Sequence, residues 1–218
     1  GVRTSDVRNR NRELSHYLME NAGQELVACL FQREDTLQEA AAVLSLSVSD
    51  VTEAERMLRS LINTVSAEER GKAPLITFCY TANKAYPVYR LPQTTLFTQL
   101  TSFVEPSMHV YATFYGGRLL LAPDEDSLLR YIRQLDNGEV LDGALAYRAG
   151  TDGLSDSYHF MLMADFAHVL DQSGYQVRYV PEFFLRNSDF FRNFVLFAQF
   201  TCADGVVYPN LVLKYKSE

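Results

Sequence analysis

Apolar and polar residues alternate most regularly in the middle of the chain, over 110–115. In residues 110–115 every second side chain is apolar, and this period of two predicts a strand, because successive side chains point to opposite faces of a sheet. Gly116-Gly117 then predicts a tight turn, since glycine adopts the positive φ that such turns need. Residues 118–122 predict the returning strand of a hairpin.

A helix is predicted directly after this hairpin. Asp124 and the acidic and hydroxyl groups of 125–127 can accept hydrogen bonds from the free amide groups of a helix start, and acids complement its dipole. Apolar residues then recur at helical spacing up to Leu135, and Asn137-Gly138 predicts a left-handed stop. The unit is therefore a hairpin, a cap and an amphipathic helix.

Similar elements are predicted along the rest of the chain. They are helices over 13–21, 36–44, 50–63 and 94–104, strands over 25–32 and 158–163, and hairpins formed by 75–81 with 86–91 and by 194–202 with 206–215. Hairpins dominate, and the alternation of helices and strands is too irregular for a doubly wound sheet. The predicted fold is α+β, with a largely antiparallel sheet built from hairpin-helix units and with helices mainly on one face.

Composition and charge narrow the class of protein. Residues 1–12 are polar, which predicts a linker, and 13–218 are predicted to form a single domain. The net charge of −7 and the pI near 5.2 argue against non-specific nucleic-acid binding, because that binding needs a basic surface. The sequence has no apolar run of the ~20 residues that a membrane span needs. Because the chain begins with Gly, we expect a longer protein in which only flanking segments contact a membrane.

The sequence lacks the usual motifs of catalytic and metal sites. Its histidines are dispersed, no Gly-x-Ser-x-Gly elbow is present, and neither a P-loop nor a dinucleotide pattern follows Gly116-Gly117. The acids at 124–126 carry oxygens that a hard cation prefers, but acids at a helix start are the more common arrangement. We therefore expect no catalytic residue, no cofactor and no metal.

Two groups of residues are candidates for a ligand or partner surface. The turn-rich loop 150–157 contributes Asp152, Ser155 and Asp156, and the strands and their ends contribute Tyr111, Tyr115, Tyr158 and His159. Tyrosines can line a sugar- or peptide-binding surface, although they are also common in strands. The phenylalanines over 183–200 favour a buried core, with a hydrophobic groove for lipid or a partner as the alternative.

The order of several motifs resembles a known family. The motifs are Val110-Tyr-x-x-Phe-Tyr-Gly-Gly-x-Leu-Leu-Leu-Ala122, Asp126-Ser-Leu-x-x-Tyr131 and Tyr208-Pro-Asn210, within about 78–215. This pattern resembles a family of large bacterial cell-envelope proteins, in which a domain of unknown function lies between a membrane anchor and a repeat region resembling a β-propeller. The resemblance implies an envelope location and an anchored parent protein, and it implies no catalytic or binding residue.

The predicted function rests on the missing active-site motifs and on this resemblance. We predict a non-catalytic interaction or scaffold module at the cell envelope, whose partner is a protein or another envelope component. The alternative is a hydrolase-like or small-ligand-binding domain with a site assembled from distant loops. In that case the loop 150–157 would act with Asp165 or His159, because a nucleophile such as Ser155 needs a base within hydrogen-bond reach.

Overall fold

The chain divides into two compact units. The structure is a computed structural model that describes residues 4–32, 40–63, 75–82, 84–100, 106–139, 145–170 and 180–216. Up to Asn137 these residues belong to the first unit, and from Gly138 onward they belong to the second. The span predicted as one domain, 13–218, thus contains two units with a sheet in each. The sequence does not mark the division, because apolar strands and amphipathic helices lie on both sides of it.

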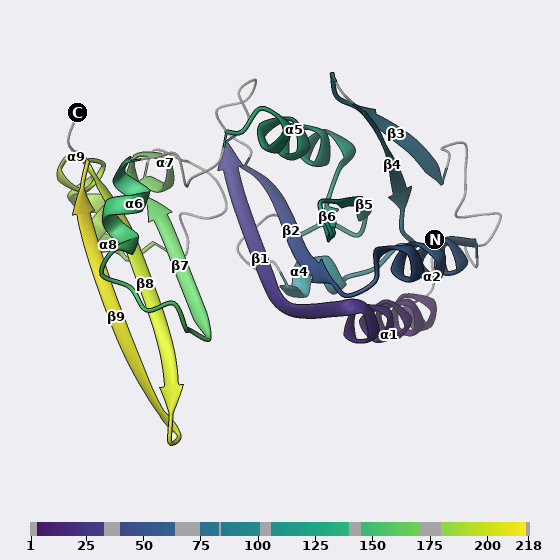
Figure 1. Cartoon of the computed structure of the whole chain (residues 1–218), viewed down its shortest axis with the longest axis horizontal. Helices are drawn as coiled ribbons and strands as arrows, with labels where there is room; N and C mark the ends of the chain where they lie inside the picture. The colour runs from purple at the N-terminus through teal and green to yellow at the C-terminus, as the bar shows by residue number, and fades with distance from the viewer. Residues whose placement is uncertain are drawn as a thin grey trace. The chain divides into compact units, whose positions relative to one another are not determined.

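The first unit is an antiparallel α+β unit. In chain order its elements are α1 (Thr4–Asn21), β1 (Ala22–Gln32), β2 (Ala40–Val48), α2 (Val51–Asn63), β3 (Ile76–Tyr80), β4 (Ala85–Arg90), α4 (Leu96–Leu100), β5 (Tyr111–Tyr115), β6 (Arg118–Ala122) and α5 (Glu125–Asp136). The six strands pair in the order β1-β2-β6-β5-β4-β3 (Figure 1). Three hairpins, β1-β2, β3-β4 and β5-β6, precede α2, α4 and α5 in the chain. The predicted α+β fold with hairpin-helix units is confirmed.

The central hairpin and helix form for the reasons that the sequence indicates. Gly116 and Gly117 have φ values of 54° and 79°, the left-handed region that a two-residue turn requires. Asp124 caps α5, because its Oδ1 accepts a hydrogen bond of 2.8 Å from the amide of Ser127. Gly138 follows the helix with a φ of 72°, which agrees with the predicted stop.

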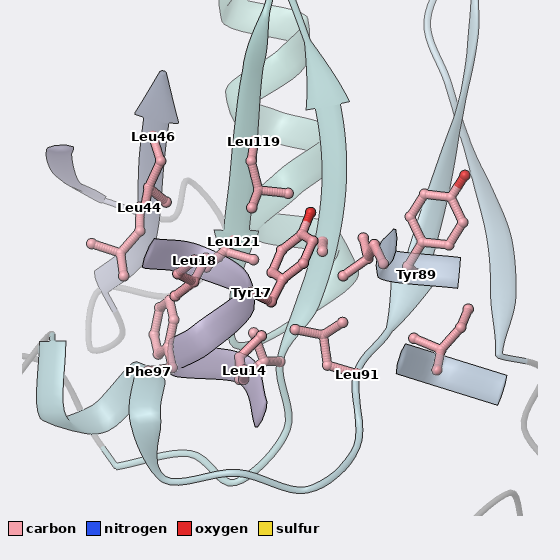
Figure 2. Close-up of a cluster of buried hydrophobic side chains, with 14 of the residues drawn as sticks. Leu14, Tyr17, Leu18, Leu44, Leu46, Tyr89, Leu91, Phe97, Leu119 and Leu121 are labelled. Carbon is pink, nitrogen blue, oxygen red and sulfur yellow. The ribbon is translucent and has the colours of Figure 1, made fainter. Parts of the chain in front are cut away.

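The sheet of the first unit has helices on both faces, with most of them on one. Helices α1, α2 and α4 cover one face, where the core contains Leu14, Tyr17, Leu18, Leu44, Leu46, Leu58, Ile62, Tyr89, Leu91, Phe97, Leu119 and Leu121 (Figure 2). Helix α5 covers the other face, where Leu128 and Ile132 pack on Val43, Val88 and Leu120. The prediction of helices mainly on one face is confirmed for this unit.

Two local predictions differ from the structure. Residues 4–12, predicted as a linker, belong to α1, and Asn11 is bound to the start of α4 by a hydrogen bond of 2.7 Å from Nδ2 to Thr95 Oγ1. The helix predicted over 36–44 is wrong, because Ala40–Val48 is strand β2; residues 36–39 lie outside the described part. Strand β2 lies between β1 and β6, and pairing on both edges outweighs the helical preference of its alanines and leucines.

The second unit is smaller and also antiparallel. Its elements are α6 (Leu145–Thr151), β7 (Phe160–Asp165), α7 (Phe166–Leu170), α8 (Glu182–Arg186), α9 (Ser188–Phe191), β8 (Phe194–Ala203) and β9 (Val206–Tyr215). The three strands pair in the order β7-β8-β9 (Figure 1). The predicted terminal hairpin is confirmed, and it turns at Asp204 and Gly205, both with positive φ.

Candidate functional site

One face of the β7-β8-β9 sheet packs against helix α6. Phe197 of β8 is 0% exposed, and its ring centroid lies 6.1 Å from that of Tyr147 in α6. The backbone of α6 comes so close at Gly150 that a Cβ atom there would lie 2.0 Å from Cε2 of Phe197. Val195 and Gln199, on the same face of β8, are also buried. This face is the core of the second unit.

The opposite face of the same sheet carries apolar side chains and is largely open. We call it the apolar face; its residues are Phe160, Leu162, Ala164, Phe194, Leu196, Ala198, Phe200, Cys202, Val207, Pro209, Leu211, Leu213 and Tyr215. The most exposed of them include Leu211 at 65%, Tyr215 at 58%, Val207 at 56% and Phe160 at 55%. None of these residues is charged, whereas Asp165 and Lys214 lie on the α6 side of the sheet.

Strand pairing arranges the apolar face in five rows that run across the strands, and the outermost of them, beyond row 1, is Cys202 with Val207. Row 1 is Phe160, Phe200 and Pro209; row 2 is Leu162, Ala198 and Leu211; row 3 is Ala164, Leu196 and Leu213; and row 4 is Phe194 and Tyr215. The ring centroids are 5.8 Å apart for Phe160 and Phe200, and 5.3 Å apart for Phe194 and Tyr215. Aromatic side chains therefore lie in rows 1 and 4, with the aliphatic rows 2 and 3 between them.

The exposed apolar area of this face is as large as the largest apolar patch of a typical soluble monomer. A fully accessible large apolar residue presents on the order of 150–200 Å². The six most exposed members, each open by about half, therefore present roughly 600 Å² together. The largest apolar patch of a typical soluble monomer is about 300–600 Å², and patches of this size commonly mark interaction sites. Half-buried Phe194, Leu196 and Phe200 enlarge the surface further.

An aromatic cluster formed by residues of helices α7, α8 and α9 lies next to row 4. The ring centroids of Phe184 and Phe191 are 4.8 Å apart, and Phe191 is 8% exposed. Phe190 is 61% exposed, and its ring centroid lies 5.1 Å from that of Phe194. The phenylalanine-rich run, for which the sequence favours a core, is thus divided: some rings are buried, while Phe183 and Phe190 extend the exposed apolar surface.

The predicted loop residues are attached to the sheet of the second unit. The amide of Ser155 donates to Oε1 of Gln199 at 2.9 Å, and Nε2 of Gln199 donates to the carbonyl of Ser155 at 2.6 Å. The hydroxyl of Ser155 accepts a hydrogen bond from the amide of Ser157, and Nδ1 of His159 accepts one from the amide of Cys202. Asp152, Asp156 and Tyr158 are exposed. Buried Gln199 therefore positions this loop.

The two predicted tyrosines of β5 belong to the first unit. The hydroxyl of Tyr115 donates to Oδ1 of Asp136 at 2.8 Å, and this bond, followed by burial, raises the pKa of Tyr115 to about 12. The hydroxyls of Thr81 and Tyr115 hold the pKa of Asp136 below its usual value. Burial raises the pKa of Tyr111. The predicted site residues are therefore divided between the units, five of them in the second.

A second candidate is a groove beside helices α1 and α2 in the first unit. It has a volume of about 380 Å³ and is lined by Glu13, His16, Tyr17, Glu20, Arg56, Met57, Ser60 and Leu61. Nε2 of His16 lies 3.2 Å from a carboxylate oxygen of Glu20, and both side chains are well exposed. Arg56 pairs with Glu53 beside the groove, and exposed ion pairs such as these contribute little to stability.

No cluster of metal ligands occurs in the described part of the chain. Among those residues no group of three or more His, Cys, Asp or Glu side chains could hold a metal ion. The acids of 124–126 instead serve helix α5: Asp124 caps it, and Asp126 Oδ2 accepts a hydrogen bond of 2.7 Å from Arg130. This is the helix-start arrangement that the sequence favours.

Comparison with known proteins finds no family model, curated protein or solved structure that matches the chain. The resemblance to a cell-envelope family therefore stays a prediction. No helix within the described ranges is both long and apolar enough to cross a membrane.

The residues that form the apolar face on β9 are not predicted from the sequence as a binding surface. Leu211, Leu213 and Tyr215 alternate with Asn210, Val212 and Lys214, and such alternation normally places the apolar side toward the core. In the structure α6 covers the other side of the sheet, and Leu211 is 65% exposed. Periodicity identifies which residues share a face, but it does not identify the face that a helix covers.

Proposed function

We propose that this chain is a non-catalytic interaction module and that the apolar face is its binding surface. The observation that carries the proposal is an uncharged sheet face with Leu211, Tyr215, Val207 and Phe160 each more than half exposed. Transfer of roughly 600 Å² of apolar surface out of water is worth about 15 kcal/mol at about 25 cal/mol per Å². This is comparable to the ~4–15 kcal/mol that association itself costs. Stable binding thus requires most of the face to be covered.

The shape of the surface favours a macromolecular partner. A small-ligand site is usually concave and encloses most of the ligand surface. The apolar face is instead one side of a three-stranded sheet whose register continues from row 1 to row 4. A broad face with two aromatic rows and two aliphatic rows between them matches the apolar core of a protein interface, which is depleted in charge and enriched in aromatic residues.

We further propose that the module acts at the bacterial cell envelope. The support for this location is the resemblance of the motifs over about 78–215 to a family of envelope proteins. Its partner there would be a protein or another envelope component. Fractionation of cells that make the full-length protein tests the location: recovery with envelope membranes is expected, and recovery in the soluble cytoplasmic fraction alone would contradict it.

The binding role is tested by site-specific photo-crosslinking in the cells that make the protein. A benzophenone amino acid is placed at position 211 on the apolar face, and the control has it at position 208 on the opposite side of β9. The two native side chains are 65% and 53% exposed, so simple accessibility is matched. We expect a discrete crosslinked species from position 211 and none from position 208. Equal, diffuse crosslinking from both positions would refute the role of the apolar face.

A further inference from the structure

We propose that the apolar face binds a second copy of this chain, so that two β7-β8-β9 sheets pack face to face across a two-fold axis. This inference rests on the proposed function and names the partner. Three features support it: the absence of charge on the face, the pattern of its rows and its area.

Because the apolar face carries no charge, two copies of it can contact each other without charge repulsion. In a two-fold interface the same patch occurs on both sides, so any charged residue near the axis meets a like charge. The chain has a net charge of −7, yet the thirteen residues of the apolar face carry none. A copy of the same face therefore introduces no charge repulsion at the contact. An anionic lipid surface fits less well, because it attracts basic segments rather than an acidic chain.

The rows of the apolar face are complementary when one copy is turned end to end. With the two-fold axis across the strands between rows 2 and 3, row 2 meets row 3 of the second copy. Leu162 of β7 then faces Ala164 of the second copy, and Leu196 of β8 faces Ala198 of the second copy. On β9, Leu211 faces Leu213 of the second copy, so the pairing of large with small residues holds for β7 and β8. Large residues placed opposite small ones let two layers interdigitate at native density. Sheets pack in this way about 10 Å apart, with their strands within about 30° of each other.

Rows 1 and 4 are also complementary in this arrangement, whereas the row of Cys202 and Val207 has no row opposite it. Row 1 meets row 4, so Phe200 of β8 faces Phe194 of the second copy, and Pro209 of β9 faces Tyr215. Aromatic rings thus meet aromatic rings or proline, and paired aromatic rings contribute ~0.5–1.5 kcal/mol beyond the area that they bury. Turning the copy along the strand axis instead would place row 2 against row 2, where Ala198 faces Ala198 and a gap remains.

The area is that of an ordinary stable dimer. A standard interface buries about 800 Å² on each partner. The five most exposed residues of rows 1 to 4 present roughly 500 Å², and the half-buried members of rows 1, 3 and 4 bring the area that faces the second copy to roughly 600–700 Å². This lies within the range of about 600–1,000 Å² for one partner of a specific interface. Edge-to-edge pairing through β9 is less favourable, because Pro209 has no N–H to donate to an added strand.

Sedimentation velocity of the full chain across ~0.1–100 µM tests the inference. We expect a reversible dimer, and we expect Leu211→Asp to weaken it at least ~100-fold, because each dimer would bury two unpaired carboxylates. Tyr208→Asp is the matched control, since Tyr208 is 53% exposed on the other side of β9, and it should leave the dimer intact. Leu211 is 65% exposed, so its replacement should not unfold the chain, which circular dichroism checks.

Each contrary result has a distinct meaning. A wild-type chain that stays monomeric up to ~100 µM would refute the proposal that the partner is a second copy. A different protein crosslinked to position 211 would then still support the proposed function. A monomer that floats with neutral phospholipid vesicles would refute the dimer and would indicate that the apolar face binds lipid. A dimer that survives Leu211→Asp would overturn the face as the interface.

Chemical crosslinking tests the orientation of the two copies. In a Cys202→Ser background, Leu162→Cys and Ala164→Cys chains are treated with a short bismaleimide, separately and mixed. We expect the mixture to crosslink faster than either chain alone, because position 162 faces position 164 of the second copy. Equal rates in all three samples would overturn the end-to-end arrangement.

Discussion

Replacing Gly150 by Ala has two opposite effects on the stability of the second unit, one from helix propensity and one from packing. Gly150 lies in the last turn of α6, where Ala is preferred over Gly by ~1 kcal/mol if only the helix is considered. In the structure, however, the new Cβ would lie 2.0 Å from Cε2 and 2.4 Å from Cζ of Phe197. Phe197 is 0% exposed, so its ring has no open space to enter. The packing effect should therefore exceed the propensity effect.

The expected net change is a loss of stability. Overpacking of a filled core costs typically ~1–3 kcal/mol and sometimes more. After the ~1 kcal/mol gain in helix propensity, we expect Gly150→Ala to lower the unfolding free energy of the second unit by up to ~2 kcal/mol. Gly153→Ala is the control, because no atom lies within 4 Å of its added Cβ, and its effect should stay within about 0.5 kcal/mol.

Hydrogen exchange of amides in β8 (Phe194–Ala203) measures this change locally, which is necessary because a chain with two units need not unfold in one step. Phe197→Leu in the Gly150→Ala background should recover part of the loss, since the smaller side chain accepts the new methyl group. Increased protection in Gly150→Ala, as propensity alone predicts, would refute the contact between α6 and β8.

Three further predictions concern the first unit. Leu58→Ala in α2 should lower the unfolding free energy in urea by ~2–5 kcal/mol, because Leu58 is 0% exposed; a change below 1 kcal/mol would contradict its burial. Asp124→Ala should cost ~1 kcal/mol in the same assay through the lost bond to the amide of Ser127, with Asp124→Asn close to wild type. The lowered pKa of Asp136 stabilises the folded state above the ordinary Asp pKa, and this contribution is lost as pH falls through the folded-state pKa. Tyr115→Phe should raise that pKa in an NMR titration, and an unchanged value would contradict the bond between the two side chains.

Local signals in the sequence were sufficient where they act over a few residues. The hairpin at Gly116 and Gly117, the cap at Asp124 and the turn at Asp204 and Gly205 all depend on backbone conformations or hydrogen bonds within one turn. These elements were predicted with their boundaries nearly correct. The α+β class followed from them, because hairpins followed by amphipathic helices restrict the choice of layers.

Signals that depend on distant partners were missed. The run of Ala and Leu before Val48 is compatible with a helix or a buried strand, and only pairing with both β1 and β6 makes it a strand. Residues 4–12 lack an apolar stripe, yet Asn11 joins them to Thr94 and Thr95 more than eighty positions away.

The grouping of the predicted site residues also depends on distant parts of the chain, which the sequence pattern does not show. Tyr111 and Tyr115 share the period of β5, and Asp152, Ser155 and Asp156 share a polar loop, but residue type alone does not place them in different units. The apolar face escaped prediction because a side chain such as Leu211 has the same pattern whether a helix covers it or leaves it open.

Carbene footprinting of β9 tests the central claim most directly. The full chain is labelled at ~10 µM and after dilution to ~10 nM, and labelling of Leu211 and Leu213 is compared with that of Tyr208. If a second copy covers the apolar face, labelling of the two leucines should rise severalfold on dilution while that of Tyr208 stays constant. Equal labelling of the leucines at both concentrations, at the level that their exposure of 65% and 45% implies, would contradict the account.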